Sequence, residues 1–170
     1  REILKGGPQH LLAECLAKIG QNAEAEAQYK QALEQEPEAP GIIHDYAFFM
    51  HQQKRSLEAL QTLHGAVDKG INDERLWHLG GFIVNSQAEF LEFGLEWTAE
   101  ALQFFPDHAG IRGFRGETLL KAGRIEEALP FFQQADGPGQ PSARAAVILC
   151  ELVLDRQAMP VTPDDEGKTS

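Results

Sequence analysis

The sequence predicts an all-α fold, a solenoid of about four helix-turn-helix repeats followed by a ninth helix. The first observation is a period of small residues, which recur every 34 or 35 residues at Ala25, Ala59, Gly94 and Ala128. The second is that an alanine follows each of them after seven residues, at Ala32, Ala66, Ala101 and Ala135. Small residues on one face of a helix let a neighbouring helix approach closely, so this period indicates a row of stacked helices.

Turn-forming residues divide the first half of the chain into two repeats. Pro8 and Pro40 suit the first turn of a helix, and Asn22 is expected to cap a second helix. Pro37 ends the first repeat and Gly70 ends the second. The expected repeats span residues 8–37 and 40–70, with helices over 8–20, 22–36, 40–53 and 56–69.

The second half of the chain continues this plan. Pro106 closes a third repeat, Gly123 marks the turn inside a fourth, and a Gly- and Pro-rich stretch precedes the ninth helix. The expected repeats span 73–106 and 107–136, with a partial fifth over 142–157 and helices over 73–86, 88–105, 107–122, 125–136 and 142–157. We therefore assign residues 1–157 to one helical repeat domain and residues 158–170 to a flexible acidic tail.

The first helices of the four repeats share a pattern when they are placed in register. They read Leu12-Ala13-x-x-Leu16, Tyr46-Ala47-x-x-Met50, Gly80-Gly81-x-x-Val84 and Arg115-Gly116-x-x-Leu119. With Trp77 before Gly80, and with Tyr29, Leu63 and Phe132 four residues after their small partners, the pattern resembles the tetratricopeptide repeat over residues 8–140. The resemblance implies a right-handed superhelix whose first helices line a concave groove for an extended or helical peptide.

Three departures from that repeat stand out. Arg115 occupies a position where a large apolar residue is usual, and Thr98 replaces a large residue in the third repeat. One residue is inserted between Val84 and Gly94. We expect Thr98 and the insertion to loosen or re-aim the third repeat locally.

Histidine and phenylalanine recur on the face that the resemblance assigns to the groove. His10, His44 and His78 are spaced by 34 residues, each directly after the tryptophan position of its repeat. Helical spacing puts further residues on this face or at its edges. Glu14 and Glu117 are predicted to form i,i+4 ion pairs with Lys18 and Lys121, and they are also candidates for contact with charged residues of a bound peptide. The predicted peptide-binding groove comprises His10, Glu14, His44, Phe48, His51, Arg75, His78, Phe82, Asn85 and Glu117.

Three histidines in phase also raise the question of a metal site. Zinc–nitrogen bonds are about 2.0–2.1 Å long, whereas packed helices lie about 8–10 Å apart. One ion therefore cannot bind His10, His44 and His78 together, and we predict no metal site and no cofactor. Two interpretations of the ladder stay open: a ligand groove, or ordinary solvated and packing histidines without a role.

Composition limits the class of partner. The chain has 15 Lys and Arg against 26 Asp and Glu, a net charge of −11, so nucleic acid is not expected as a partner. No apolar run approaches the roughly 18 residues of a membrane-spanning helix, so no membrane is expected either. Cys15 and Cys150 are expected to be buried and unpaired, which favours the cytoplasm and leaves the periplasm open.

The ninth helix is apolar on more than one face, although a terminal helix of a solenoid needs a polar outer side. We expect the tail or a second copy of the chain to cover it, so self-association through this helix is a prediction. Its apolar residues are Val147, Ile148, Leu149, Leu152, Val153 and Leu154.

No catalytic constellation recurs at a fixed spacing, and no serine or cysteine is expected within reach of a histidine. The sequence therefore predicts a non-enzymatic scaffold for protein–protein interaction that binds a peptide or helix of a partner in its groove. The alternative is a substrate-selecting or oligomerising region of a larger enzyme, such as a glycosyltransferase, whose catalytic domain lies outside these residues.

Overall fold

A computed structural model describes residues 7–135 and 141–158, and the helices it contains confirm the all-α prediction. Nine α-helices and one short 3-10 helix, with no strand, account for the regular structure of these residues. They are α1 (Pro8–Lys18), α2 (Asn22–Gln35), α3 (Pro40–Gln52), α4 (Ser56–Val67), α5 (Glu74–Ser86), η1 (Ala88–Phe90), α6 (Leu91–Phe104), α7 (Ala109–Lys121), α8 (Ile125–Ala135) and α9 (Pro141–Ala158).

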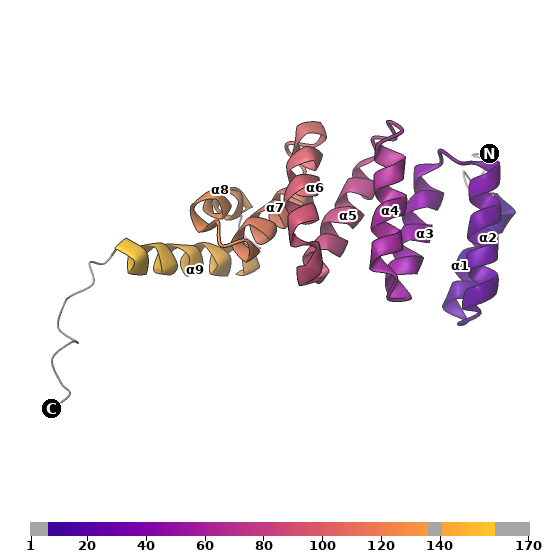
Figure 1. Cartoon of the computed structure of the whole chain (residues 1–170), viewed down its shortest axis with the longest axis horizontal. Coiled ribbons are helices and arrows are strands. Elements are labelled where there is room, and N and C mark those ends of the chain that lie inside the picture. The colour runs from indigo at the N-terminus through magenta and orange to yellow at the C-terminus, as the bar shows by residue number, and fades with distance from the viewer. Residues whose placement is uncertain (1–6, 136–140, 159–170) are drawn as a thin grey trace, which may run out of the picture.

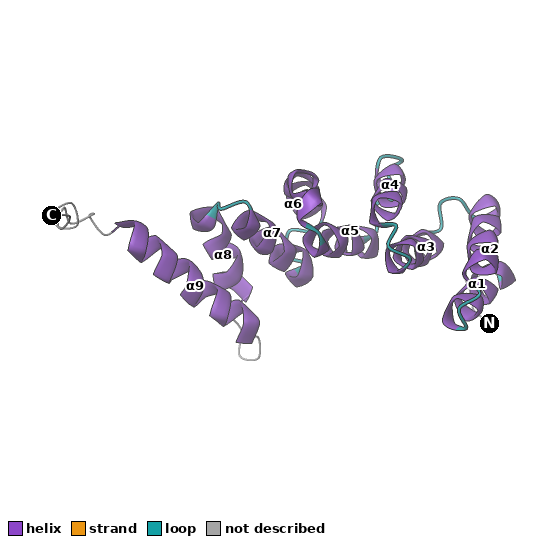
Figure 2. Ribbon diagram, turned by 60° about the horizontal axis from the view of Figure 1, so that its bottom comes forward, coloured by secondary structure: helices purple, strands orange, loops and turns teal. Residues whose placement is uncertain are grey.

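The helices form an elongated array in chain order, with α1 and α2 at one end and α9 at the other (Figure 1). Each odd-numbered helix from α1 to α7 packs against the even-numbered helix that follows it. The odd-numbered helices also contact one another in succession, so they form one layer. The helices α4 and α6 lie together against one face of this layer and belong to a second layer (Figure 2). This arrangement is the predicted solenoid.

The periodic small residues lie where helices meet. Ala25, Ala59, Ala101 and Ala128 are completely buried. A Cβ atom added to Gly94 would lie 3.2 Å from the side chain of Val84, closer than most real Cβ contacts. The period therefore marks close helix–helix contacts, which larger side chains would force apart.

The structure corrects two local predictions. Asn22 is the first residue of α2 and does not cap it, because the N-cap position is held by Gln21 and no side chain bonds to the helix end there. The single helix expected over 88–105 is instead a 3-10 turn followed by α6. This turn lies between Val84 and Gly94 and takes up the inserted residue, so the second half of the repeat keeps its register.

Two departures from the repeat pattern compensate each other. The guanidinium of Arg115 donates from Nη1 to the carbonyl oxygen of Leu95 at 2.6 Å and to Oγ1 of Thr98 at 3.3 Å. Thr98 is buried, and its hydroxyl also donates to the Gly94 carbonyl oxygen at 2.7 Å. Arg115 thus satisfies polar groups in the neighbouring helix, and partial desolvation lowers its pKa.

Trp97, which precedes Thr98 on α6, is a large buried side chain of the third repeat. Its ring centroid lies 4.6 Å from that of Trp77, and its Nε1 donates to the Trp77 carbonyl oxygen at 3.0 Å. A Cβ atom on Gly80 would come within 2.3 Å of the Trp97 ring. Glycine at position 80 is therefore required by the close approach of this tryptophan.

The ends of the array are less buried than its centre. Cys15 is exposed, contrary to the prediction, whereas Cys150 is buried as expected. On α9 the side chains of Ile148, Leu149 and Leu152 are exposed.

The predicted tail lies outside the described residues, except that α9 continues to Ala158. No described helix is both long and apolar enough to cross a bilayer.

Candidate functional site: the groove face

The odd-numbered helices carry every residue of the predicted groove. Because these helices stack directly on one another, their side chains form a continuous surface along the array. His10 and Glu14 lie on α1, His44, Phe48 and His51 on α3, Arg75, His78, Phe82 and Asn85 on α5, and Glu117 on α7.

The centre of this surface is apolar. Phe48 and Phe82 are 39% and 44% exposed, although the structure buries most other large apolar side chains of α3 and α5. The His51 ring meets Phe82 edge to face, with centroids 5.6 Å apart. Burial, and secondarily the positive charge of Lys54, lowers the pKa of His51, so its ring is neutral near pH 7 and adds to the apolar surface.

His51 also contacts a serine, which the sequence analysis did not expect. Its Nδ1 lies 2.9 Å from Oγ of Ser56, and this hydroxyl accepts a second hydrogen bond from Nε2 of Gln87 at 3.0 Å. Ser56 is only 3% exposed. A substrate carbonyl cannot reach this hydroxyl, so the pair is a packing contact between α3, α4 and the turn after α5.

His78 lies in a second group of rings between α5 and α7. Its ring centroid is 5.0 Å from that of Phe114 and 5.4 Å from that of His108. Partial desolvation, followed by the charges of His108 and His44, lowers the pKa of His78. A Cβ atom on Gly110 would lie 2.7 Å from the His78 ring, so any larger residue at position 110 would clash with the ring in its present position.

Asn85 and Arg75 are already bonded within the chain. The Asn85 amide donates to the carbonyl oxygens of Gly81 and Phe114 and to the Thr118 hydroxyl, at 3.0–3.2 Å. Arg75 forms a 2.8 Å ion pair with Asp73, the N-cap residue of α5. Asn85 therefore joins α5 to α7, and Arg75 lies at the edge of the groove face.

The two predicted i,i+4 ion pairs are absent from the described residues. Glu14 lies near His10 on the same helix. Lys121 of the fourth repeat donates a hydrogen bond to the Asn85 side chain of the third repeat. Glu117 is exposed and stays free of these bonds. Glu14 thus has another i,i+4 partner on α1, and only Lys121 has a partner in a different repeat. Such replacement costs little, because an i,i+4 pair at a helix surface contributes only about 0.2–0.5 kcal/mol.

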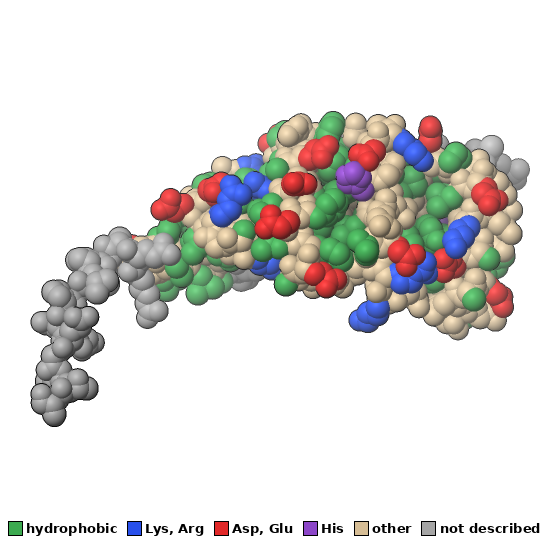
Figure 3. Space-filling view, in the orientation of Figure 1, with side chains coloured by type: hydrophobic (Ala, Val, Ile, Leu, Met, Phe, Trp, Pro, Cys, Tyr) green, Lys and Arg blue, Asp and Glu red, His purple; other side chains and the backbone are tan. Residues whose placement is uncertain are grey.

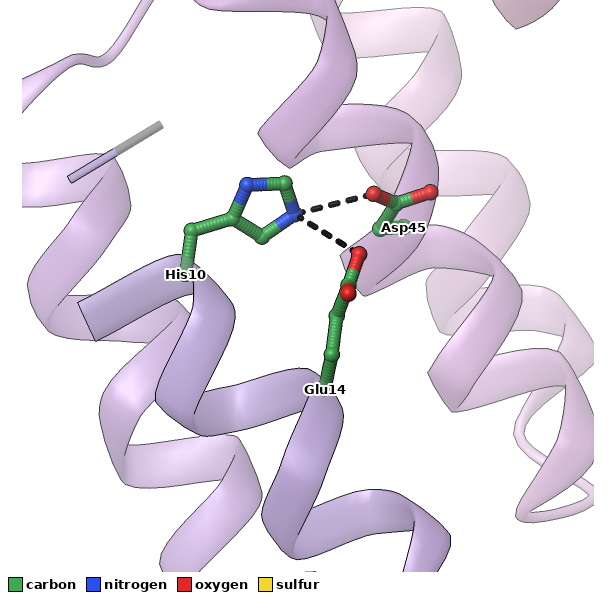
Figure 4. Close-up of side chains that lie close together, drawn as sticks. All are labelled: His10, Glu14 and Asp45. Carbon is green, nitrogen blue, oxygen red and sulfur yellow. Dashed lines mark hydrogen bonds and ion pairs between the residues drawn. The ribbon is translucent and has the colours of Figure 1, made fainter. Parts of the chain in front are cut away.

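His10 and Glu14 meet Asp45 at the α1 end of the groove face (Figure 4). His10 Nε2 lies 2.9 Å from Asp45 Oδ2 and 3.7 Å from Glu14 Oε1. The other Asp45 oxygen lies 2.8 Å from His44 Nδ1. Burial opposes ionisation of Asp45, but the hydrogen bonds from His44 and His10 outweigh it and lower its pKa.

Sequence reasoning missed a pocket on the opposite layer of the solenoid. It has a volume of about 410 Å³ and lies between α4 and the η1–α6 segment, where Figure 3 shows apolar side chains among acidic ones. Its lining residues are Leu57, Leu60, Gln61, His64, Gly65, Phe90 and Phe93. The one signal in the sequence was the residue inserted between Val84 and Gly94, because the 3-10 turn that takes up this insertion carries Phe90.

The sequence of the first two repeats and part of the third matches a known family. A model described as tetratricopeptide repeat matches residues 16–80. A search of curated proteins found no match.

Solved structures share the fold over most of the chain. YrrB, described as a TPR protein with an unusual peptide-binding site, is 20% identical with a TM-score of 0.69, over 90% of this chain and 79% of that one. MamA from Desulfovibrio magneticus RS-1 is 13% identical with a TM-score of 0.71, over 88% and 87%. Pseudomonas aeruginosa pilF is 18% identical with a TM-score of 0.62, over 88% and 75%. At these identities the likeness shows a common helical fold.

Proposed function

We propose that this chain, a tetratricopeptide-repeat solenoid, is a non-catalytic scaffold that binds a peptide or helix of a partner protein on its groove face. The observation that carries the proposal is the pair Phe48 and Phe82, two exposed aromatic side chains on adjacent stacked helices. Exposed rings on a rigid surface are typical anchor points of interfaces. YrrB, described as a TPR protein with an unusual peptide-binding site, supports the same use of the fold.

The neighbours of the two phenylalanines define the kind of ligand. His51 and His78 border them with rings whose pKa values are lowered, so the central surface is largely uncharged at neutral pH. Glu14 and Asp45 lie at one end of the groove face and the exposed Glu117 lies toward the other. We therefore infer a peptide with apolar side chains at its centre and basic residues at its flanks, which also suits a net charge of −11.

The exposed Cys15 supports a proposal on location. An unpaired, accessible thiol persists in a reducing compartment and is oxidised readily elsewhere, so we place the scaffold in the cytoplasm.

A library of displayed peptides, selected on the immobilised chain, tests the groove. Peptides selected on the wild type should bind the double variant Phe48→Ala, Phe82→Ala more weakly by about 2 kcal/mol or more, because both apolar anchors are lost. Titration calorimetry measures the affinities, and far-ultraviolet circular dichroism checks that the helices are retained.

The pocket on the opposite layer supplies the matched control. The variant Leu57→Ala, Phe93→Ala truncates two of its apolar side chains and should leave the affinity of the selected peptides unchanged. If this control loses affinity and the groove variant keeps it, the binding surface is the pocket between α4 and α6, and the proposal is wrong.

A further inference from the structure

The cluster of His10, Glu14 and Asp45 combines three potential metal ligands from two repeats. One ligand atom of each residue lies within 4.8 Å of the others, and Figure 4 shows His10 Nε2 directed toward both carboxylates. His10 and Glu14 are one helical turn apart on α1, while Asp45 belongs to α3. One ion cannot bind the three histidines of the ladder, but the structure brings together one histidine and two carboxylates.

The two carboxylates have no basic partner among the described side chains apart from histidine. Glu14 pairs with His10, and Asp45 pairs with His10 and His44. Burial and then the negative charges of Asp45 and Glu14 raise the pKa of the nearby Tyr29 hydroxyl. The site is therefore a region of negative potential that a cation would stabilise.

The spacing of the ligand atoms suits a divalent metal ion. Two ligand atoms each about 2.1 Å from a tetrahedral zinc ion lie roughly 3.4 Å apart. The separations of 2.9 Å and 3.7 Å from His10 Nε2 to Asp45 and Glu14 lie on either side of that value. Small side-chain rotations would bring all three atoms to bonding distance.

The surroundings supply the support that metal ligands usually have. His44 Nδ1 holds the second oxygen of Asp45 and so orients this carboxylate. His10 is 8% exposed and held against Tyr29, with ring centroids 6.0 Å apart, whereas Glu14 and Asp45 are partly open to solvent. An ion can enter from the open side, and water can complete its coordination.

We propose that His10, Glu14 and Asp45 bind a divalent transition-metal ion such as Zn²⁺ at the junction of the first two repeats. An imidazole with two carboxylates favours such an ion over Mg²⁺ or Ca²⁺, which prefer oxygen ligands alone. Because the ligands come from α1 and α3, the ion joins these two helices and stabilises the N-terminal end of the solenoid. Binding of the ion needs no peptide, but it would neutralise Glu14 and Asp45, the carboxylates that the proposed function assigns to a basic flank of the peptide.

Titration of the whole chain with Zn²⁺ alone tests the proposal. We expect one equivalent to bind at micromolar concentrations and to raise the melting temperature, and we expect EDTA to reverse the rise. Glu14→Gln, which changes a partly exposed side chain and should fold normally, should weaken Zn²⁺ binding at least about tenfold. Asp45→Asn and His10→Gln should weaken it further.

The matched control is His64→Ala, which removes the other histidine with a carboxylate at i,i+4. His64 Nδ1 on α4 lies 2.9 Å from Oδ2 of Asp68, the residue that follows this helix, but this exposed pair offers only two ligands. The control should bind Zn²⁺ like the wild type. A wild type that binds no Zn²⁺, or Zn²⁺ binding that Glu14→Gln and Asp45→Asn leave unchanged, would overturn the proposal and leave a histidine bridged to two carboxylates by hydrogen bonds.

Discussion

The first three repeats and the C-terminal helices have the same architecture but differ in how they are buried. One continuous cluster of buried side chains runs from α1 to the start of α7 and includes Trp77 and Trp97. A second, smaller cluster joins α7, α8 and α9 through Leu119, Phe132 and Cys150. The exposed Leu149 and Leu152 of α9 lie beyond it.

The difference follows from position in the array. A helix inside a solenoid is packed on both sides by neighbouring repeats, whereas a terminal helix has a neighbour on one side only. We therefore expect the ends to unfold locally at lower free energy than the centre, even where the repeat motif is intact.

The largest effect on stability is expected when a buried alanine of either region is replaced by a larger residue. Ala59→Leu should lower the free energy of unfolding by about 1–3 kcal/mol, because Ala59 is completely buried between packed helices. Ala128→Leu introduces the same change in the smaller second cluster, where we expect the added volume to be relieved by local separation of α8 and α9. Chemical denaturation measures the first effect, and hydrogen exchange of α8 and α9 measures the second.

Equal global losses in these two variants, with no faster exchange in α9, would show that the array unfolds as one unit. The comparison between the regions would then be wrong.

A smaller effect is expected from an ion-pair network that joins repeats in the first region. Arg55 binds Glu26 through both Nη atoms, at 2.7 Å and 3.1 Å, and Lys30 adds a third contact at 2.8 Å. Glu26→Gln should cost about 1 kcal/mol at neutral pH. Arg124 and Glu127 form the matched pair in the second region, but both lie at the start of one helix, so Glu127→Gln should cost less.

The pH dependence of this network has a defined sign. The hydrogen bonds from Arg55 and then Lys30 lower the pKa of Glu26 from 4.5 to about 2 in the folded chain. Because the folded pKa is the lower one, the stabilisation is complete above about pH 4.5 and is lost as the pH falls toward 2. Denaturation midpoints of wild type and Glu26→Gln should therefore converge between pH 4.5 and 2, and a constant difference would contradict this assignment.

The smallest effect on stability is expected at the exposed face of α9. Leu149→Lys with Leu152→Lys should change the free energy of unfolding by less than about 0.5 kcal/mol, since both side chains are more than half exposed. The same variant should reduce self-association at high concentration, because an exposed apolar stripe favours contact between copies. Light scattering over a concentration series measures this, with Ile19→Lys as the control at the other end. A wild type that stays monomeric throughout would contradict the predicted self-association.

Much of the fold could be predicted because its determinants are local. Pro8 and Pro40 begin α1 and α3, and Gly70 and Gly123 adopt positive φ at the turns where the prediction placed helix ends. The largest miss in the regular structure was the 3-10 turn before α6, because an inserted residue can be absorbed in several ways that sequence does not distinguish.

The candidate site was less predictable. The period of 34 residues placed His10, His44 and His78 on successive stacked helices, but it could not show that His10 is buried or that His51 lies against a serine. The predicted partners of Glu14 and Glu117 were wrong, because spacing alone does not decide between several candidates: Glu14 lies near His10 on its own helix, and Lys121 donates to Asn85 of the preceding repeat.

From the sequence one can derive the repeat length, the nine α-helices of the described residues and the stacking of the first helices, because these follow from spacing, small residues and turn formers within about 35 residues. Tertiary structure alone decided how Arg115 and Thr98 compensate each other, which histidine meets two carboxylates, and where the apolar pocket opens. These features depend on side chains from different repeats meeting at a few ångströms, and such distances are set by the packing of whole helices.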